Sequence, residues 1–214
     1  MGASMAFNCL RGGNDMVVHD IRREAATRHL EAGAQWADTP REVAAASDVV
    51  FTSLPGPVEV EAVSLGEDGI MSGMEAGKTY FDLSTSSPTL IRQIHDRVAA
   101  QGINVLDAPV SGGPAGASSG RLAIWVGGDK AVFDQHKAVL DSIGDAAYYV
   151  GPIGSGAVAK LVHNCAGYIV QTALAEAGDR RGVRRILHQL RVRCGLGVDG
   201  PQGADECVQR VFVF

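Results

Sequence analysis

The chain has 214 residues with a formal net charge of −5, and 46% hydrophobic and 20% charged residues. This is the composition of a globular protein and argues against a disordered or collagen-like chain. The negative charge argues against a basic surface for nucleic acid or anionic membrane. No apolar run reaches the roughly 18 residues that span a bilayer. The four cysteines form no CxxC pair, so we expect free thiols and a cytoplasmic protein without nucleic-acid or membrane partners.

The first hundred residues alternate helical and strand-like patterns. Apolar residues at helical spacing predict a helix over residues 1–10, ended by Gly12 and Gly13. In chain order there follow a strand at 16–18, helices at 21–31 and 40–46, a strand at 49–54, a helix at 58–65, a strand at 79–83 and a helix at 89–101. Strands that alternate with helices of this size predict an α/β fold with a mainly parallel sheet.

The next segments continue the same pattern. We predict a strand at 104–108, a glycine-rich loop at 111–120, a strand at 122–126, a helix at 130–143 and a strand at 147–150. A longer helix with an apolar stripe then runs from beyond Gly156 to about Ala177.

The segment 180–214 differs in composition from the rest of the chain. It holds 7 basic and 3 acidic residues, whereas residues 1–179 hold 12 and 21. Glycine and proline interrupt any regular periodicity between residues 195 and 209. We therefore predict an irregular, basic tail after the long helix.

Asp20 is a candidate ligand residue, because ligands of an α/β sheet bind at the carboxyl ends of its strands. Its carboxylate follows a predicted strand and can accept hydrogen bonds from an adenosine ribose, which disfavours a 2′-phosphate. A turn or helix-cap role is equally compatible with the sequence. Arg22 and Arg23 follow closely and can bind a phosphate, so NAD is favoured and NADP stays open.

Two further groups of residues are suited to bind or convert a small acid. Ser111, Gly112 and Gly113 offer a hydroxyl and backbone N–H groups to a carboxylate or phosphate, with a plain flexible loop as the alternative. Lys160 lies four residues before Asn164 on a predicted helix and is suited to proton transfer, with a surface lysine as the alternative. No HExxH motif or paired His/Cys set predicts a metal site.

Four motifs occur in a fixed order along the chain. They are MGASMAFN at 1–8, DLST at 82–85, DAPVSGG at 107–113 and GAVAKLVHN at 156–164. They resemble the end of the GLGxMGxxMAxN cofactor signature, the nicotinamide-side loop, the substrate loop and the catalytic helix of the β-hydroxyacid dehydrogenase family, the group of 3-hydroxyisobutyrate dehydrogenase. The resemblance extends over almost all of residues 1–177.

This resemblance implies a Rossmann-like, doubly wound fold and NAD(P)-dependent hydride transfer between a small 3-hydroxy acid and its semialdehyde. It implies that Lys160 exchanges the proton of the substrate oxygen, which Asn164 orients. It implies that Ser111 and the N–H groups near Gly112 and Gly113 hold the substrate carboxylate. The predicted cofactor-binding residues are Gly2, Asp20, Leu54, Pro55 and Thr85.

The chain departs from the family pattern at both ends. The first strand and the first two glycines of GxGxxG are missing, so we expect a sheet without its central first strand and with two exposed strand edges. Similarity fades near residue 177, where the family continues into an all-helical domain that closes the cleft and usually forms a dimer. We therefore expect an incomplete dinucleotide-binding domain at 1–152, an interdomain helix at 153–179 and a divergent tail at 180–214.

Alternative functions stay open on the sequence alone. An inactive fragment or an interaction module would use the exposed sheet edges and the basic tail to pair with another chain. The KLVHN segment at 160–164 also resembles the KxxHN helix of 6-phosphogluconate dehydrogenase. Imine reduction on a related scaffold is a further alternative. A homo-oligomer is expected of the complete family only.

Overall fold

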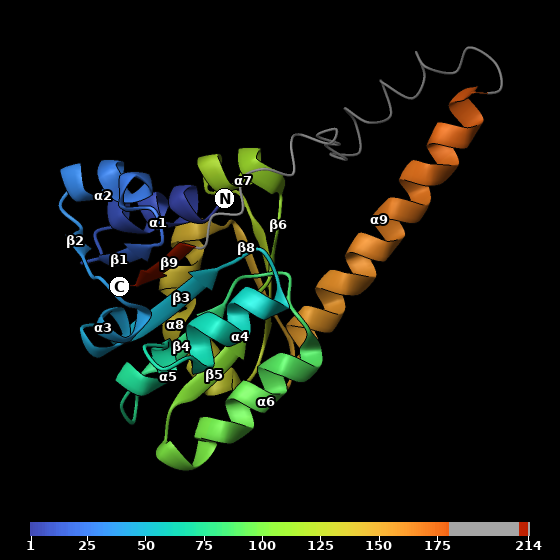
Figure 1. Cartoon of the computed structure of the whole chain (residues 1–214). Helices are drawn as coiled ribbons and strands as arrows, with labels where there is room; N and C mark the ends of the chain where they lie inside the picture. Colours follow the sequence, from blue (N-terminus) through green and yellow to red (C-terminus); the bar gives the residue numbers. More distant parts are fainter. Residues whose placement is uncertain (180–209, 214) are drawn as a thin grey trace. The chain divides into compact units, whose positions relative to one another are not determined.

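The computed structural model describes residues 1–179 and 210–213 (Figure 1). It groups into two compact units: the first consists of Met1–Lys160 together with Cys207–Phe214, and the second of Leu161–Glu206. None of the helices in the described part of the chain is long and apolar enough to cross a membrane.

The first unit is built on one sheet. Its strands are β1 (Val17–Asp20), β2 (Gln35–Trp36), β3 (Val49–Ser53), β4 (Thr79–Asp82), β5 (Asn104–Asp107), β6 (Val110–Ser111), β7 (Ala123–Gly127), β8 (Ala146–Gly151) and β9 (Arg210–Val213). Their order is β2-β1-β9-β3-β4-β5-β7-β6, with β8 paired to β7. Neighbours β1/β2, β3/β4, β4/β5 and β7/β8 run parallel. The predicted α/β fold with a mainly parallel sheet is therefore confirmed.

Helices connect most of these strands and cover both faces of the sheet (Figure 1). They are α1 (Gly2–Arg11), α2 (Thr27–Glu31), α3 (Pro40–Ala45), α4 (Pro57–Leu65), α5 (Ile70–Gly73), α6 (Pro88–Val98), α7 (Gly113–Ser119), α8 (Lys130–Ile143) and α9 (Ser155–Asp179), with short 3₁₀ turns at Arg23–Ala26 and Ala99–Gln101. The helix predicted at 130–143 has the same bounds as α8.

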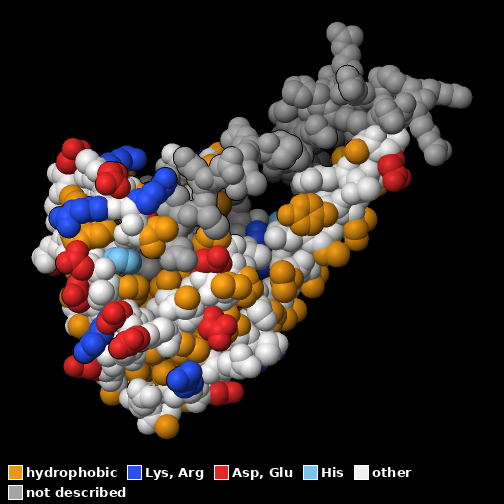
Figure 2. Space-filling view, viewed as in Figure 1, with side chains coloured by type: hydrophobic (Ala, Val, Ile, Leu, Met, Phe, Trp, Pro, Cys, Tyr) orange, Lys and Arg blue, Asp and Glu red, His pale blue; other side chains and the backbone are white. Residues whose placement is uncertain are grey.

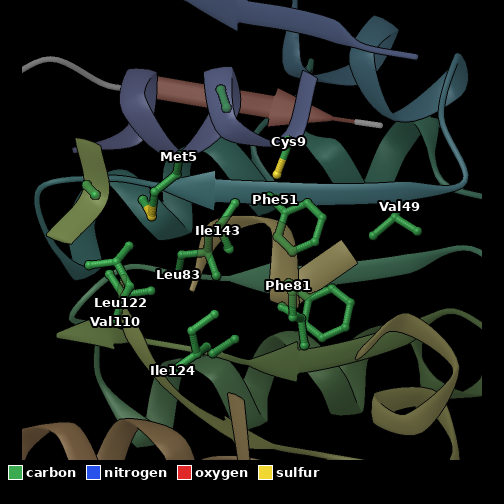
Figure 3. Packing of buried hydrophobic residues seen from close by; sticks show 14 of the residues in the cluster. Met5, Cys9, Val49, Phe51, Phe81, Leu83, Val110, Leu122, Ile124 and Ile143 are labelled. Carbon is green, nitrogen blue, oxygen red and sulfur yellow. The ribbon is translucent and has the colours of Figure 1, made fainter. Parts of the chain in front are cut away.

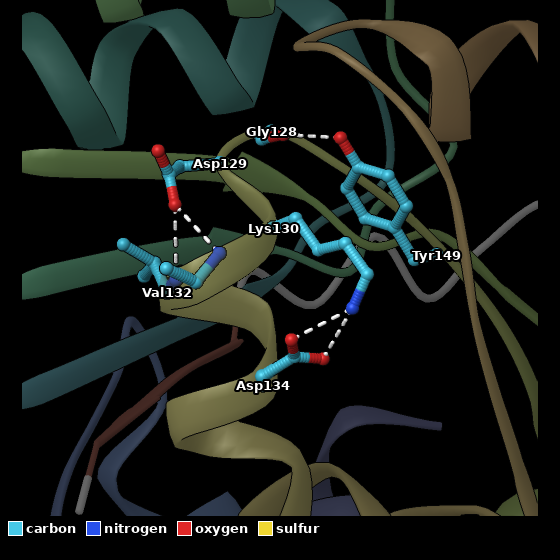
Figure 4. A network of polar contacts seen from close by, with 7 residues as sticks. Gly128, Asp129, Lys130, Val132, Asp134 and Tyr149 are labelled. Atoms are coloured by element: carbon cyan, nitrogen blue, oxygen red, sulfur yellow. Dashed lines mark hydrogen bonds and ion pairs between the residues drawn. The ribbon is translucent and has the colours of Figure 1, made fainter.

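Local side chains explain where α8 begins. The Asp129 carboxylate accepts a hydrogen bond of 3.1 Å from the N–H of Val132, so it satisfies a donor that the first turn leaves unpaired (Figure 4). Lys130 pairs with Asp134 one turn later, at 2.7 Å on the helix surface. Such exposed pairs stabilise a helix by only about 0.3–0.5 kcal/mol, so the cap contributes more than the ion pair.

Both faces of the sheet are buried, as expected for a doubly wound fold. Phe51 and Phe81 on adjacent strands stack with their ring centres 5.1 Å apart, and Met5 of α1 and Ile143 of α8 belong to the same core cluster (Figure 3). Alternate residues of a strand point to opposite faces. Tyr80, next to Phe81 in β4, accordingly belongs to a second core cluster on the other face.

The strand β9 occupies a central position that was expected to be empty. It runs antiparallel between β1 and β3, and Phe212 pairs with Val18 on one side and Phe51 on the other. The expectation of two exposed strand edges is therefore wrong, because β9 pairs with the edge of β1 and with the edge of β3. No strand was predicted at 210–213. The remainder of the predicted tail, 180–209 and 214, lies outside the described residues.

The glycine-rich segment after β6 is also different from its prediction, because most of it forms the helix α7 rather than a loop. Gly112 and Gly113 precede and begin this helix with φ of 137° and 61°, a region that favours glycine. The Asn8 side chain of α1 donates a hydrogen bond of 2.8 Å to the Ala117 carbonyl. This tertiary contact anchors a helix whose glycines and serines have low intrinsic helix propensity.

Candidate functional site

Four strands end at the same edge of the sheet. β1, β3, β4 and β5 run in one direction, so their last residues Asp20, Ser53, Asp82 and Asp107 lie along one edge. The predicted site residues Leu54, Pro55, Thr85 and Ser111 follow three of these ends in the chain. The edge thus gathers most of the predicted site residues of the first unit.

Asp82 joins the loops that follow β3 and β4. Its buried carboxylate accepts hydrogen bonds of 3.0 Å from the Thr52 hydroxyl and 3.0 Å from the N–H of Ser84. The Ser84 hydroxyl in turn accepts a hydrogen bond of 2.9 Å from the N–H of Leu54. Burial raises the pKa of Asp82 from 3.8 to about 6, although these hydrogen bonds act to lower it. The network holds two predicted cofactor loops side by side.

The outer residues of these two loops are accessible to a ligand. Pro55 and Thr85 are exposed, while Leu54 and Ser84 beneath them are buried. Of the predicted cofactor residues in these loops, Pro55 and Thr85 are accessible to a ligand. Leu54 is buried and joins the two loops through its backbone N–H, which donates to Ser84.

Asp20 lies buried at the end of β1. Its carboxylate accepts a hydrogen bond of 2.9 Å from the N–H of Arg22, which is the turn role that the sequence left open. A pocket of about 280 Å³ is lined by the flanking residues His19 and Ile21 together with Pro40, Ala62, Val63 and residues 66–69, and Asp20 itself is not part of its lining. The ribose contact of Asp20 stays a prediction.

Gly2 is buried and is the first residue of α1. The start of a helix carries unpaired N–H groups and the positive end of the helix dipole, both of which favour an anion. This is the part of the predicted pyrophosphate site that the described structure contains.

Asp107 joins the end of β5 to the start of α9. Its carboxylate accepts hydrogen bonds of 2.7 Å from the N–H of Gly154 and 2.6 Å from the N–H of Ala157. Lys160, one turn later, is buried with 9% of its surface exposed, and its Nζ lies 5.8 Å from the centre of the Trp125 ring. Burial lowers the pKa of Lys160 below its usual 10.5. A buried lysine of this kind releases its proton more easily than a solvated one.

Ser111 is connected to Lys160 through the strand β7. Ser111 pairs with Ala123 of β7, and Trp125 lies two residues further along the same strand. Residues two apart in a strand share a face, so Ala123 and Trp125 lie on the same side of β7. The structure therefore associates the predicted carboxylate-binding segment and the predicted proton donor with one strand.

Asn164 belongs to the second unit, further along α9, and is partly buried. It lines an open groove on one side of the helix together with Leu161, Cys165 and Tyr168. Hydrophobic side chains are prominent along α9 in Figure 2, and Tyr168 and Ile169 are each 64% exposed. The role of Asn164 beside Lys160 stays a prediction.

The sequence alone did not indicate a role for two aspartates, Asp82 and Asp107. Asp82 and Asp107 open the DLST and DAPVSGG segments, and both are buried with polar partners. A carboxylate at the end of an apolar strand was the available signal, but its partners are set by the tertiary fold. Within the described residues, no group of three or more His, Cys, Asp or Glu side chains is placed to hold a metal ion.

Residues 1–151 match the family model described as the NAD binding domain of 6-phosphogluconate dehydrogenase, and the chain belongs to this family. It is 38% identical over 196 residues to 2-(hydroxymethyl)glutarate dehydrogenase of Eubacterium barkeri, covering 92% of this chain and 62% of that protein. It is 36% identical over 177 residues to 3-hydroxyisobutyrate dehydrogenase of Pseudomonas aeruginosa, covering 83% and 59%. The structure of Mycobacterium tuberculosis 3-hydroxyisobutyrate dehydrogenase with L-serine matches with a TM-score of 0.77 and 30% identity, covering 92% of this chain and 64% of that one.

These relatives confirm the resemblance to the β-hydroxyacid dehydrogenases, together with the Rossmann-like fold and NAD(P) as the cofactor class. The chain spans about 60% of the length of the curated relatives it matches. Solved imine reductases at 23% identity or less share the fold alone.

Proposed function

We propose that the chain provides the cofactor-binding and proton-transfer part of an NAD-dependent β-hydroxyacid dehydrogenase. The observation that carries the proposal is Lys160, buried beside Trp125 on the strand that pairs with Ser111. The compounds named in the three relatives support the substrate class, because 2-(hydroxymethyl)glutarate, 3-hydroxyisobutyrate and L-serine all have a carboxylate and a hydroxymethyl group on the neighbouring carbon. The reaction interconverts that hydroxymethyl group and an aldehyde.

Lys160 is the proton-transfer residue in this proposal. In the oxidation direction its neutral amine takes the proton of the substrate hydroxyl as a hydride leaves the same carbon, and in reduction its ammonium returns the proton to the oxygen. When bound, the nicotinamide supplies the acceptor or donor of that hydride. The lowered pKa of Lys160 increases the fraction of neutral amine available at a given pH.

The substrate is held by groups that complement its carboxylate and its oxygen. The Ser111 hydroxyl and the N–H groups near Gly112 and Gly113 bind the carboxylate, since the positive φ angles there suit a backbone cradle for an anion. Asn164 orients the reacting oxygen. No metal is assigned a role in this proposal.

The cofactor lies along the edge formed by the ends of β1, β3 and β4 in this proposal. The pocket of about 280 Å³ suits a flat base, and the Asp20 carboxylate at the end of β1 suits a ribose and repels a 2′-phosphate. The start of α1 at Gly2 suits the pyrophosphate. The exposed Pro55 and Thr85 suit the nicotinamide end. NAD is therefore the favoured cofactor.

The proposed setting is the cytoplasm, with a small carboxylate-bearing molecule as the partner. The interaction-module alternative used unpaired sheet edges and the basic tail. β9 pairs with both β1 and β3, and residues 180–209 of the tail lie outside the described residues. No observation on the described residues favours it over the dehydrogenase.

The test begins with thermal unfolding of the purified chain in increasing NAD or NADP. Saturable binding should raise the melting temperature, and a ligand at 100 times its Kd stabilises the fold by about 2.7 kcal/mol. NADH formation is then followed with 3-hydroxyisobutyrate, L-serine and 2-(hydroxymethyl)glutarate. A chain that binds neither dinucleotide, or whose turnover survives Lys160→Ala unchanged, would contradict the proposal.

A further inference from the structure

The Asp107 carboxylate caps a helix that is distant in the sequence. The side chain is 2% exposed, and its two oxygens accept separate hydrogen bonds, one from the N–H of Gly154 and one from the N–H of Ala157. Ala157 lies in the first turn of α9, which begins at Ser155. A negative charge at a helix start satisfies unpaired donors and interacts favourably with the helix dipole.

The start of α9 packs directly on the strands beneath it. A Cβ atom placed on Gly127 of β7 would lie 2.6 Å from an Asp107 oxygen and 2.8 Å from the backbone nitrogen of Gly156. A Cβ on Gly156 would lie 2.8 Å from the backbone oxygen of Asp107. Glycine at both positions lets the backbones approach closely, so the first turn of α9 has little room to move.

The turn before α9 is held from its other side by Arg92 of α6. The Arg92 Nε donates a hydrogen bond of 3.1 Å to the carbonyl of Ile153. Burial raises the pKa of Asp107, while its hydrogen bonds and the Arg92 charge act to lower it. Asp82 also lies beside Asp107, because the two are paired in register on β4 and β5.

We infer that Asp107 is a positioning residue for Lys160: by holding the first turn of α9, it places the lysine in its buried position beside Trp125. Lys160 follows Ala157 by three residues in the same helix, so displacement of the first turn displaces the lysine. Loss of the two hydrogen bonds to the Asp107 carboxylate lets the first turn of α9 move and exposes the Lys160 amine to water. The inference deepens the proposed function, on which the catalytic importance of this position rests.

The test measures the titration of Lys160 itself. The chain has only four lysines, so ¹³C,¹⁵N-lysine labelling gives few signals, and Lys160→Arg identifies the one that belongs to Lys160. In the unaltered chain this signal should titrate below the other three. In Asp107→Asn its pKa should rise toward the value of a solvated lysine. The direction of this pKa change separates two explanations. If Asp107 acted only through its negative charge, which stabilises the ammonium, its removal would lower the Lys160 pKa instead of raising it.

Two further variants keep the test decisive. Asp129→Asn is the matched control, because Asp129 also caps a helix through its carboxylate but does so at α8, and it should leave the Lys160 pKa unchanged. Arg92→Lys keeps the charge while removing the Nε bond to Ile153, and it should raise the Lys160 pKa by less than Asp107→Asn does. If Asp107→Asn does not fold, Asp107→Glu takes its place, because it keeps the charge but moves the carboxylate away from the N–H groups of Gly154 and Ala157, and it should also raise the Lys160 pKa.

The two proposals fail in different ways. An unchanged or lowered Lys160 pKa in the folded variants overturns the positioning role, even if the chain is an active dehydrogenase. An unaltered chain without turnover on any 3-hydroxy acid overturns the proposed function and leaves the Lys160 titration interpretable. Where turnover is present, Asp107→Asn should lower kcat and leave the Kd for NAD unchanged.

Discussion

Asp82 and Asp107 are register partners on adjacent strands, but they hold different parts of the molecule. Asp82 accepts its hydrogen bonds from the neighbouring strand and from its own loop, through Thr52 and Ser84. Asp107 accepts both of its bonds from residues 47 and 50 positions later, at the start of α9. The first carboxylate therefore organises a local edge of the sheet, and the second attaches a distant helix.

This difference divides the candidate site into two separately supported sides. The cofactor side comprises the loops after β1, β3 and β4, and the substrate side comprises the end of β5, β6, α7 and the first two turns of α9. Substitutions on one side should affect dinucleotide binding, and substitutions on the other should affect proton transfer.

The largest effect is expected on the substrate side. Lys160→Ala removes the proposed proton donor and should lower the rate of hydride transfer by about 10²–10⁴-fold. The Kd for NAD should stay within twofold of its original value, as measured by titration. Lys137→Ala is the matched control, since this lysine pairs with Asp141 on the surface of α8. A comparable loss in NAD affinity would show that the two sides are not separate.

The next effect is a pH dependence of stability that belongs to the cofactor side. Asp82 binds its proton more tightly in the folded chain, with a pKa of about 6 against 3.8, so the folded state holds more protons between these values. The contribution of Asp82 to the free energy of unfolding is fully present below pH 3.8 and is lost as the pH rises through about 6. The free energy of unfolding changes by about 3 kcal/mol over this range. Urea unfolding from pH 4 to 7 should show this decline in the original chain, and Asp82→Asn should reduce it to the part that the raised pKa of Asp107 contributes. The same slope in both proteins would be evidence against the buried network.

A smaller effect is expected from β9. Phe212→Pro removes a backbone donor from a strand with neighbours on both sides and should lower the unfolding free energy by about 1–3 kcal/mol. Phe212→Ile retains the N–H and is the control. Urea unfolding that does not distinguish the two variants would contradict the central position of this strand.

The smallest effect is expected at Asp20. Asp20→Asn keeps an oxygen that can accept from the Arg22 N–H but removes the charge beside the proposed ribose position. NAD affinity should fall by about tenfold or less, and NADP affinity should fall by a smaller factor or rise. Equal losses for the two dinucleotides in parallel titrations would assign Asp20 to the turn alone.

The regular elements were predictable where their signals are local. The pattern at 130–143 gave α8 with its observed bounds, because an amphipathic face and a cap are determined within a few residues. The two-residue strand β2 and the one-turn helix α5 were missed, since elements this short have no periodicity to detect. α7 was missed because its tertiary contact with Asn8 outweighs poor helix propensity.

The candidate site was predictable only in part, for the same physical reason. Ser111 and Lys160 were candidates from their chemistry and received their roles from the family resemblance, and strand direction explains why the loop residues share an edge. The bond between Asp107 and the N–H of Ala157 joins segments that no local pattern connects. Long-range partners of buried polar groups are set by how the elements pack, and the sequence around each group does not specify them.

The antiparallel strand β9 has a consequence for how the protein is made. β1 and β3 leave the ribosome early, whereas the strand that separates them in the sheet is encoded much later in the chain. Until β9 arrives, each of these two strands has an unpaired edge, and the nearest complement for either edge is the other. The unpaired edges of β1 and β3 are therefore free for other pairings during synthesis, and the final sheet forms only when β9 lies between them.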